Sequence, residues 1–212
     1  MSTDVPPQPI EDLTRTNAFS DGVIAIAITL LAFDLAVPTF EQSAADGGLL
    51  RALLDQWPSY LAFLTSFLTI VIMWVNHHRL FGLFRAADQG LMILNGLLLM
   101  GIVVVPFTTK LLAAYLVSPV QSDVIVAAVI YAGWLLVIAF LYQAVWRYGS
   151  HRRRLLRDSV TDEMGMQINR QYRIGPPVYL AATLLAILSP LLSLLATLAV
   201  AVWFAIPPRT AR

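Results

Sequence analysis

The fold is decided by residues 15–35, which read RTNAFSDGVIAIAITLLAFDL. A transmembrane α-helix needs about 20 predominantly apolar residues, and this stretch is long enough although it opens with Arg15 and carries Asp21 inside it. An ionisable group at membrane depth is costly and usually has a specific role. The stretch therefore predicts a membrane helix in which the charged residues serve a purpose.

One face of this helix carries an apolar stripe. On a wheel of about 100° per residue, with Ile26 as the reference, the residues within about 60° are Phe19, Gly22, Val23, Thr29, Leu30 and Phe33. Asp21 lies roughly 140° away and Ser20 about 120° away, so the acidic side chain points towards other helices and the stripe points elsewhere. Such a stripe is also ordinary in helix bundles, and by itself it assigns no function.

The composition indicates an integral membrane protein, because 58% hydrophobic and 13% charged residues leave too little polar surface for a soluble globule of 212 residues. Apolar runs able to span about 30 Å of hydrocarbon lie near 18–36, 54–75, 90–107, 123–146, 175–188 and 190–206. The last two meet at Ser189-Pro190, which predicts a tight turn between antiparallel helices. The expected fold class is all-α, a polytopic membrane protein with six transmembrane helices.

The charge distribution predicts the orientation. If the N-terminus is cytoplasmic, only Arg51 and Lys110 of the basic residues face outward, as the positive-inside rule requires. The cytoplasmic ones are Arg15, Arg79, Arg85, Arg147, Arg152, Arg153, Arg154, Arg157, Arg170, Arg173, Arg209 and Arg212. We therefore expect a multi-pass protein of the inner (plasma) membrane with both termini cytoplasmic. The outer face is rich in acidic residues, which either concentrate cations or are simply solvated.

Along the chain, residues 1–14 are proline-rich and polar and are expected to be a disordered cytoplasmic N-terminus, followed by a six-helix transmembrane domain over 15–212. Nothing before residue 18 has the pattern of a removable signal peptide. Residues 37–48 are expected to form an outer loop. Residues 147–173 are expected to form the only substantial cytoplasmic segment, whose basic cluster fixes topology and contacts anionic lipid headgroups.

The second span ends in WVNHHRLF at 74–81, at the same membrane level as residues 15–21. We expect Trp74, Asn76 and one histidine to donate hydrogen bonds to the Asp21 carboxylate and the Ser20 hydroxyl, because lipid cannot satisfy these groups. Asp21 would then clamp two helices together.

Metal binding and catalysis are not expected. His77 and His78 point about 100° apart on a helix and cannot both bind one ion, and no third ligand follows at helical spacing. Motifs of hydrolases, metalloproteases and P-loop proteins are missing, and there is no cysteine. The internal repeats of transporters and the T-V-G-Y-G filter of other potassium channels are also missing, so any ion conduction must rely on side chains.

The R-x-x-x-F-S-D text of residues 15–21, the W-x-N-H-H text of residues 74–78 and the segment 94–108 resemble the transmembrane protein 175 potassium-channel family over roughly residues 15–115. The fourth to sixth spans match only in hydropathy and order. The resemblance implies a homotetramer of six-helix chains in which the first helix of each subunit lines a central pore. Potassium is then the permeant ion, and no cofactor is needed.

Carried over by position, the resemblance implies that Ile26 forms the pore constriction, that Leu30 adds a layer, and that Phe33 closes the stripe one turn outward. Phe33 departs from the branched aliphatic residue expected there. Thr29 matches a hydroxyl that assists selectivity beside the constriction. The structural signature residues are Arg15, Phe19, Ser20, Asp21, Trp74, Asn76 and His77. We expect Arg15 and Asp21 to be architectural.

The predicted function is an ion channel with moderate selectivity for potassium over sodium, in which a hydrophobic ring is both filter and gate. The alternatives are a proton-coupled or small-solute transporter that uses Asp21 as a relay, and a non-conducting membrane scaffold. The expected partners are copies of the same chain and the lipid bilayer, with no nucleic acid and no metal.

Overall fold

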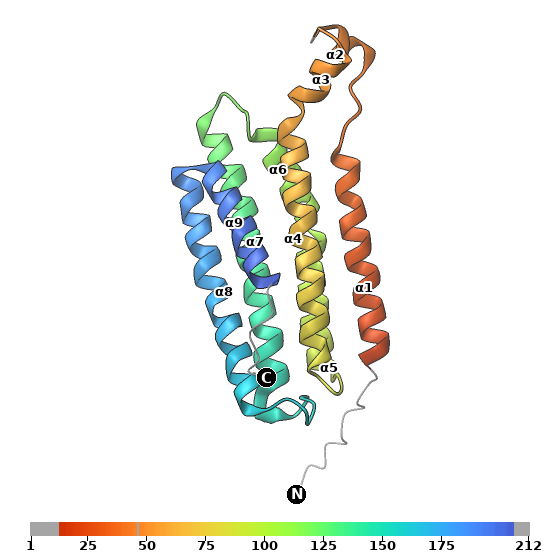
Figure 1. Ribbon diagram of the computed structural model, residues 1–212, viewed down its shortest axis with the longest axis vertical. Coiled ribbons are helices and arrows are strands. Elements are labelled where there is room, and N and C mark those ends of the chain that lie inside the picture. Colours follow the sequence, from red (N-terminus) through yellow and green to blue (C-terminus); the bar gives the residue numbers. More distant parts are fainter. Residues whose placement is uncertain (1–12, 46, 206–212) are drawn as a thin grey trace, which may run out of the picture.

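The computed structural model describes residues 13–45 and 47–205, which form a bundle of long helices with two short helices at one end (Figure 1). The elements are α1 (Leu13–Leu30), the 3-10 helix η1 (Leu31–Asp34), α2 (Phe40–Ala45), α3 (Leu49–Asp55), α4 (Trp57–Gly82), α5 (Gln89–Val103), α6 (Val105–Tyr115), α7 (Gln121–Ser150), the 3-10 helix η2 (His151–Arg153), α8 (Asp162–Leu188) and α9 (Pro190–Ala205). The predicted all-α class is confirmed.

Four helical segments in the described part of the chain are long and apolar enough to cross a membrane. They are Leu13–Phe33, Trp57–Gly82, Gln89–Tyr115 and Gln121–Arg153. Helix α8 is as long as these but has a polar first half, and α9 has 16 residues, or about 24 Å at 1.5 Å per residue. The protein is therefore a helical membrane protein, and the two C-terminal helices differ in character from the first four spans.

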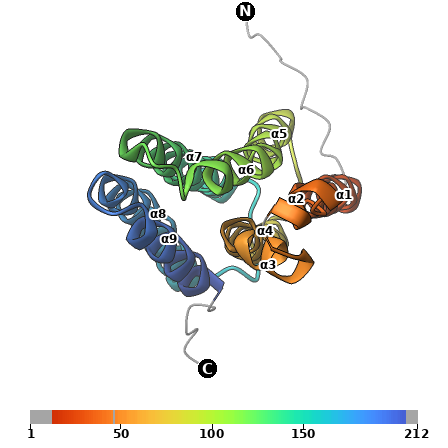
Figure 2. The same cartoon turned by 90° about the horizontal axis from the view of Figure 1, so that it is seen from above.

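Helix α1 buries one narrow face. Its buried residues recur at helical spacing, namely Leu13, Ser20, Ile24 and Ala27, and Leu31 of η1 continues the face. This face packs against α4, α5 and α6, and the view along the bundle places α1 at its edge (Figure 2). One side of α1 is therefore committed to the subunit, and the other side faces outward.

The third span is longer than predicted and is interrupted. The sequence predicted 90–107, whereas α5 and α6 together reach Tyr115. The interruption falls at Val104, two residues before Pro106. Proline lacks the N–H that an uninterrupted helix would use, so the chain breaks the helical ladder here and then continues.

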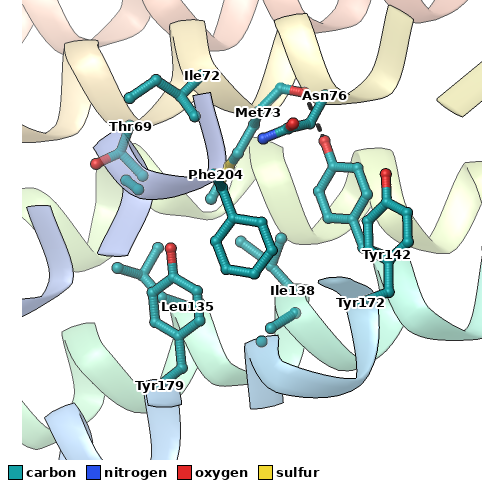
Figure 3. A pocket seen from close by; sticks show the side chains of 13 residues that line it. Thr69, Ile72, Met73, Asn76, Leu135, Ile138, Tyr142, Tyr172, Tyr179 and Phe204 are labelled. Carbon is teal, nitrogen blue, oxygen red and sulfur yellow. Dashed lines mark hydrogen bonds between the residues drawn. The ribbon is translucent and has the colours of Figure 1, made fainter. Parts of the chain in front are cut away.

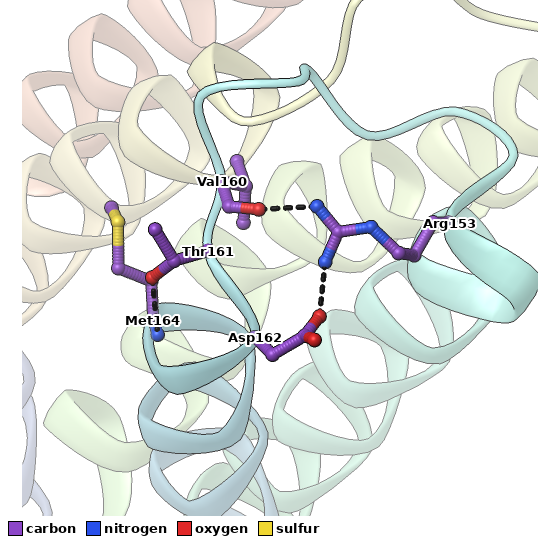
Figure 4. Close-up of polar contacts among 5 residues, drawn as sticks. All are labelled: Arg153, Val160, Thr161, Asp162 and Met164. Carbon is purple, nitrogen blue, oxygen red and sulfur yellow. Dashed lines mark hydrogen bonds and ion pairs between the residues drawn. The ribbon is translucent and has the colours of Figure 1, made fainter.

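The predicted cytoplasmic segment 147–173 contains the ends of two helices and the linker between them. Helix α7 continues to Ser150 and α8 begins at Asp162, so the linker is reduced to 151–161. Thr161 caps α8 by accepting a hydrogen bond from the Met164 amide at 3.2 Å. Arg153 donates to Asp162 at 2.5 Å and also to the Val160 carbonyl, which closes the linker on itself (Figure 4).

Other boundaries gave mixed results. The turn at Ser189-Pro190 is confirmed, because α8 ends at Leu188 and α9 begins at Pro190. The predicted outer loop 37–48 contains helix α2 and is wrong to that extent. Of the predicted disordered segment 1–14, residues 1–12 lie outside the described residues, while Leu13 and Thr14 already belong to α1.

The α4–α5 and α7–α8 linkers are joined by backbone pairing. The Arg85 amide donates to the Leu155 carbonyl, and the Arg157 amide donates to the Leu83 carbonyl, each at 2.9 Å. Between them, the buried Phe84 ring packs against α7 at Gly149, where a Cβ atom would lie 2.4 Å from the ring. Only glycine allows this close approach, so the two linkers form one packed end of the bundle.

Asp88 connects this end to the helices. Its carboxylate caps α5 by accepting from the Leu91 amide at 2.9 Å, accepts from the Tyr148 hydroxyl at 3.0 Å, and pairs with Arg154 at 2.5 Å. Asp88 is buried, and a buried carboxylate needs such partners. Arg153 and Arg154 belong to the arginine cluster predicted to contact lipid headgroups. Both therefore form ion pairs with carboxylates of the same chain.

We predict that Asp88→Ala lowers the free energy of unfolding by about 2 kcal/mol, because it removes a helix cap and leaves the Leu91 amide and the Tyr148 hydroxyl without their acceptor. Thermal unfolding of the purified protein in detergent measures this. Asp158→Ala, at an exposed position in the α7–α8 linker, is the matched control and should change the melting temperature little. Equal effects of the two substitutions would show that Asp88 does not hold this end together.

Candidate functional site

The outward side of α1 carries the predicted stripe. Large side chains there are exposed within the subunit: Phe19 64%, Ile26 60%, Leu30 40% and Phe33 81%. Gly22 and Thr29 are exposed as well. A run of exposed apolar side chains along a whole helix marks a surface that contacts lipid or another protein. The wheel thus predicted the exposed face, although no contact of the described chain shows what lies opposite it.

Phe33 sits in a different backbone geometry from the rest of the stripe. It belongs to η1, because the α-helix gives way to a 3-10 turn after Leu30. The tighter 3-10 turn has about 3.0 residues per turn, so a wheel drawn for an α-helix no longer applies at Phe33. Ile26 and Leu30 form the regular part of the stripe, and Phe33 is its end.

Thr29 is the one hydroxyl of the stripe, and its proton is already used. The Thr29 hydroxyl donates to the Ile26 carbonyl at 2.8 Å. The oxygen keeps its acceptor lone pairs, so Thr29 offers an oxygen, and no free proton, to whatever lies beside Ile26.

The buried side of α1 is held by a chain of polar contacts. Asn95 of α5 donates from its amide nitrogen to the Ser20 hydroxyl at 2.9 Å, and its amide oxygen lies 2.8 Å from His77 Nε2 of α4. The oxygen can only accept, so His77 Nε2 donates. The Ser20 hydroxyl in turn donates to the Thr16 carbonyl at 2.8 Å. All three side chains are at least 98% buried, and together they join α1, α4 and α5.

A second contact lies one residue along α1. Trp74 Nε1 donates to the Asp21 carboxylate at 2.8 Å, which is the hydrogen bond predicted from the sequence. A bond to a charged acceptor is stronger than a neutral one, and it ties α1 to α4 beside the first network. Arg15, which opens the motif, is exposed.

The structure corrects two parts of the predicted network. Asn76 does not reach Asp21 or Ser20, because it lies on another side of α4 and lines a cavity with Tyr142 and Tyr172. His77 reaches Ser20 only through Asn95. The role of Asn95 was missed, although a lone amide inside the apolar run 90–107 is a signal, since polar side chains in membrane helices usually bond across helices.

The described residues contain no cluster of three or more His, Asp or Glu side chains that could hold a metal ion. His77 is occupied by Asn95 and stacks on Phe81 with ring centroids 4.2 Å apart. Both the hydrogen bond and the stacking fix the imidazole as a packing element.

Comparison with known proteins now decides the family. A potassium channel of Chamaesiphon minutus is 45% identical over 192 residues, which cover 91% of this chain and 93% of the relative. The chain belongs to the TMEM175 family. The model of this family, described as the endosomal/lysosomal potassium channel TMEM175, matches residues 15–106, so the predicted resemblance is confirmed.

Two further TMEM175 comparisons agree. A potassium channel of Streptomyces collinus is 41% identical over 182 residues, covering 86% of both chains. The crystal structure of a lysosomal potassium-selective channel TMEM175 homolog from Chamaesiphon minutus superposes with a TM-score of 0.81 at 44% identity, covering 91% of this chain and 95% of that one. The fold is therefore shared along nearly the whole TMEM175 chain, including spans that matched only in hydropathy.

We predict that Asn95→Leu destabilises this TMEM175 protein more than any other single change in the network. It leaves both Ser20 and His77 without their shared partner, at a cost of about 1–3 kcal/mol for each buried unsatisfied group. Thermal unfolding in detergent provides the measurement. Asn169→Leu, which replaces an exposed amide on α8, is the control and should be nearly neutral; an equal loss from both would contradict the role of Asn95.

Proposed function

We propose that this TMEM175 protein is a potassium channel formed by four copies of the chain, with α1 of each copy lining a central path. The observation that carries the proposal is the exposed stripe of Ile26 and Leu30 on a helix whose other face is locked into the subunit. One stripe cannot enclose a path, so several copies must face one another. The relatives named as potassium channels support potassium as the permeant ion, and they are not enzymes.

The proposed mechanism is desolvation at a hydrophobic ring. Four Ile26 side chains offer no oxygen ligands, so a cation must shed or reshape its hydration shell to pass. Potassium holds its water less tightly than sodium and therefore loses less free energy, which gives a moderate preference for potassium. The same ring can empty of water and close the path, so filter and gate coincide.

The neighbouring positions have supporting roles in this proposal. Leu30 forms a second apolar layer, and Phe33 ends it with a ring instead of a branched aliphatic chain. The acceptor oxygen of Thr29 lies beside the constriction and orients the water that the ion retains. Arg15 and Asp21 are architectural, since Asp21 already bonds to Trp74 on the side away from the stripe.

We further propose six membrane crossings, made by α1, α4, the α5–α6 pair, α7, α8 and α9. With an even number of crossings both termini lie on the same side of the membrane. The basic residues of the α4–α5 and α7–α8 linkers support the cytoplasmic side of the inner (plasma) membrane for both. A relay of protons through Asp21, as in the transporter alternative, is disfavoured because Asp21 is held by Trp74.

Disulfide cross-linking tests the arrangement. The chain has no cysteine, so single cysteines can be introduced without a modified background. Ile26→Cys and Leu30→Cys should link subunits on oxidation, because the proposed stripe faces the axis. Ile28→Cys is the matched control, since Ile28 packs against the core of its own subunit. Efficient linking from position 28 alone would refute the arrangement.

Liposome flux tests the mechanism. Ile26→Asn should wet the constriction and offer sodium an oxygen ligand, so the potassium preference should fall at least several-fold while total flux persists or rises. Thr29→Val should reduce the preference less, because it removes only one acceptor. Fluxes are measured under potassium and sodium gradients with purified protein of known oligomeric state.

Asp21→Asn is the contrasting variant. It should weaken the assembly, seen as an earlier melt or loss of the oligomer peak, without changing the ion preference of the protein that remains assembled. If Ile26→Asn leaves flux and preference unchanged in an intact oligomer, the hydrophobic constriction is wrong. If Asp21→Asn changes the preference, Asp21 lies in the ion path.

A further inference from the structure

A cavity lies inside the subunit between α4, α7, α8 and α9, on a different face of α4 from the Asp21–Trp74 contact. Its volume is about 40 Å³. Its wall combines apolar side chains with several polar ones that face the same space (Figure 3). The polar members are Thr69, Asn76, Tyr142, Tyr172 and Tyr179.

Two of these polar groups are satisfied by the protein. The Tyr142 hydroxyl donates to the Met73 carbonyl at 2.6 Å, and the Thr69 hydroxyl donates to the Thr65 carbonyl at 2.8 Å. Each keeps an acceptor lone pair. These two bonds leave the cavity lined by oxygen atoms that can accept further hydrogen bonds.

The other three polar groups have no hydrogen-bond partner among the described residues. Within the described residues, the Asn76 amide and the hydroxyls of Tyr172 and Tyr179 make no hydrogen bond to the protein. Tyr179 is only 7% exposed, and Tyr172 is fixed by stacking on Tyr142 with ring centroids 6.2 Å apart. In a lipid environment, polar groups without partners are costly, and these groups face a space in which they can bind a polar ligand.

The volume of the cavity limits which ligands can fit in it. A site for one water molecule needs roughly 10–15 Å³, whereas an engineered dry cavity that binds benzene measures about 150 Å³. A space of about 40 Å³ is too small for benzene or a lipid chain and has room for about three water molecules. Each water needs two to four polar partners, and the five polar side chains of the wall supply them.

We propose that this cavity holds a cluster of about three ordered water molecules that hydrogen-bond to Asn76, Tyr172 and Tyr179. The cluster joins α4, through Asn76, to α8, through the two tyrosines. It complements the direct bond from Tyr142 of α7 to the Met73 carbonyl of α4. The water therefore acts as a bound structural ligand between the helix that holds α1 and the C-terminal helices, independently of the proposed ion path.

High-resolution structures in lipid nanodiscs test the occupancy. Wild-type density should show water peaks within hydrogen-bond distance of Asn76 and Tyr172, and these peaks should weaken or vanish in Tyr172→Phe. Tyr148→Phe is the matched control, since the Tyr148 hydroxyl donates to Asp88 and does not line the cavity. An empty cavity, a dry cavity that takes up xenon under pressure, or density for a lipid chain would each overturn the proposal.

Thermal unfolding provides a second, independent test. Asn76 and Tyr172 make no direct hydrogen bond, so their substitutions should be additive unless water couples them. We expect Asn76→Leu and Tyr172→Phe each to lower the melting temperature, and the double variant to lower it by clearly less than the sum. The pair Asn76→Leu with Tyr148→Phe should be additive, because Tyr148 lies outside the cavity lining. Additivity in both pairs would overturn the water-mediated link.

Discussion

The structure depends on the inability of lipid to form hydrogen bonds. Inside a bilayer, an unpartnered polar side chain is costly, and on α1 Ser20 and Asp21 find their partners on neighbouring helices. Ser20 accepts a hydrogen bond from Asn95, which also bonds to His77, and Asp21 accepts a hydrogen bond from Trp74. These bonds fix the rotation of α1 about its own axis, because turning the helix by one residue, about 100°, would carry both groups away from their partners.

The direction of the apolar stripe follows from that rotation. Ile26 lies about 120–140° from Ser20 and Asp21 around the helix, so locking the polar side inward leaves Ile26 and Leu30 outward. The stripe therefore points outward without any contact made by its own side chains. A precise hydrophobic surface at the edge of a subunit is thus produced by hydrogen bonds on the opposite side of the same helix.

The sequence correctly predicted the features that depend on one helix or on a single polar residue in lipid. Helical periodicity identified the exposed face of α1, and the cost of a charge in lipid identified Asp21 and its partner Trp74. It failed where several helices had to be placed together. Asn76 and His77 are neighbours in sequence but lie on different sides of α4, and only the position of α5 shows that Asn95 serves both His77 and Ser20. Hydropathy likewise missed the first half of α8, because residues 162–174 form a helix that is too polar to be recognised as a span.

The two faces of α1 have different roles, and this matters for conduction through the proposed apolar ring. A ring without ligands discriminates only through its width and dryness, so small shifts of Ile26 change both. The polar network suits this demand because hydrogen bonds are directional and weaken steeply when their angle is distorted, so they resist rotation of the helix. In the proposed channel, the hydrogen bonds on the Ser20 side hold the helix and the apolar Ile26 side chains form the constriction. Thr29, whose proton is bound to the Ile26 carbonyl, adds one acceptor oxygen beside them.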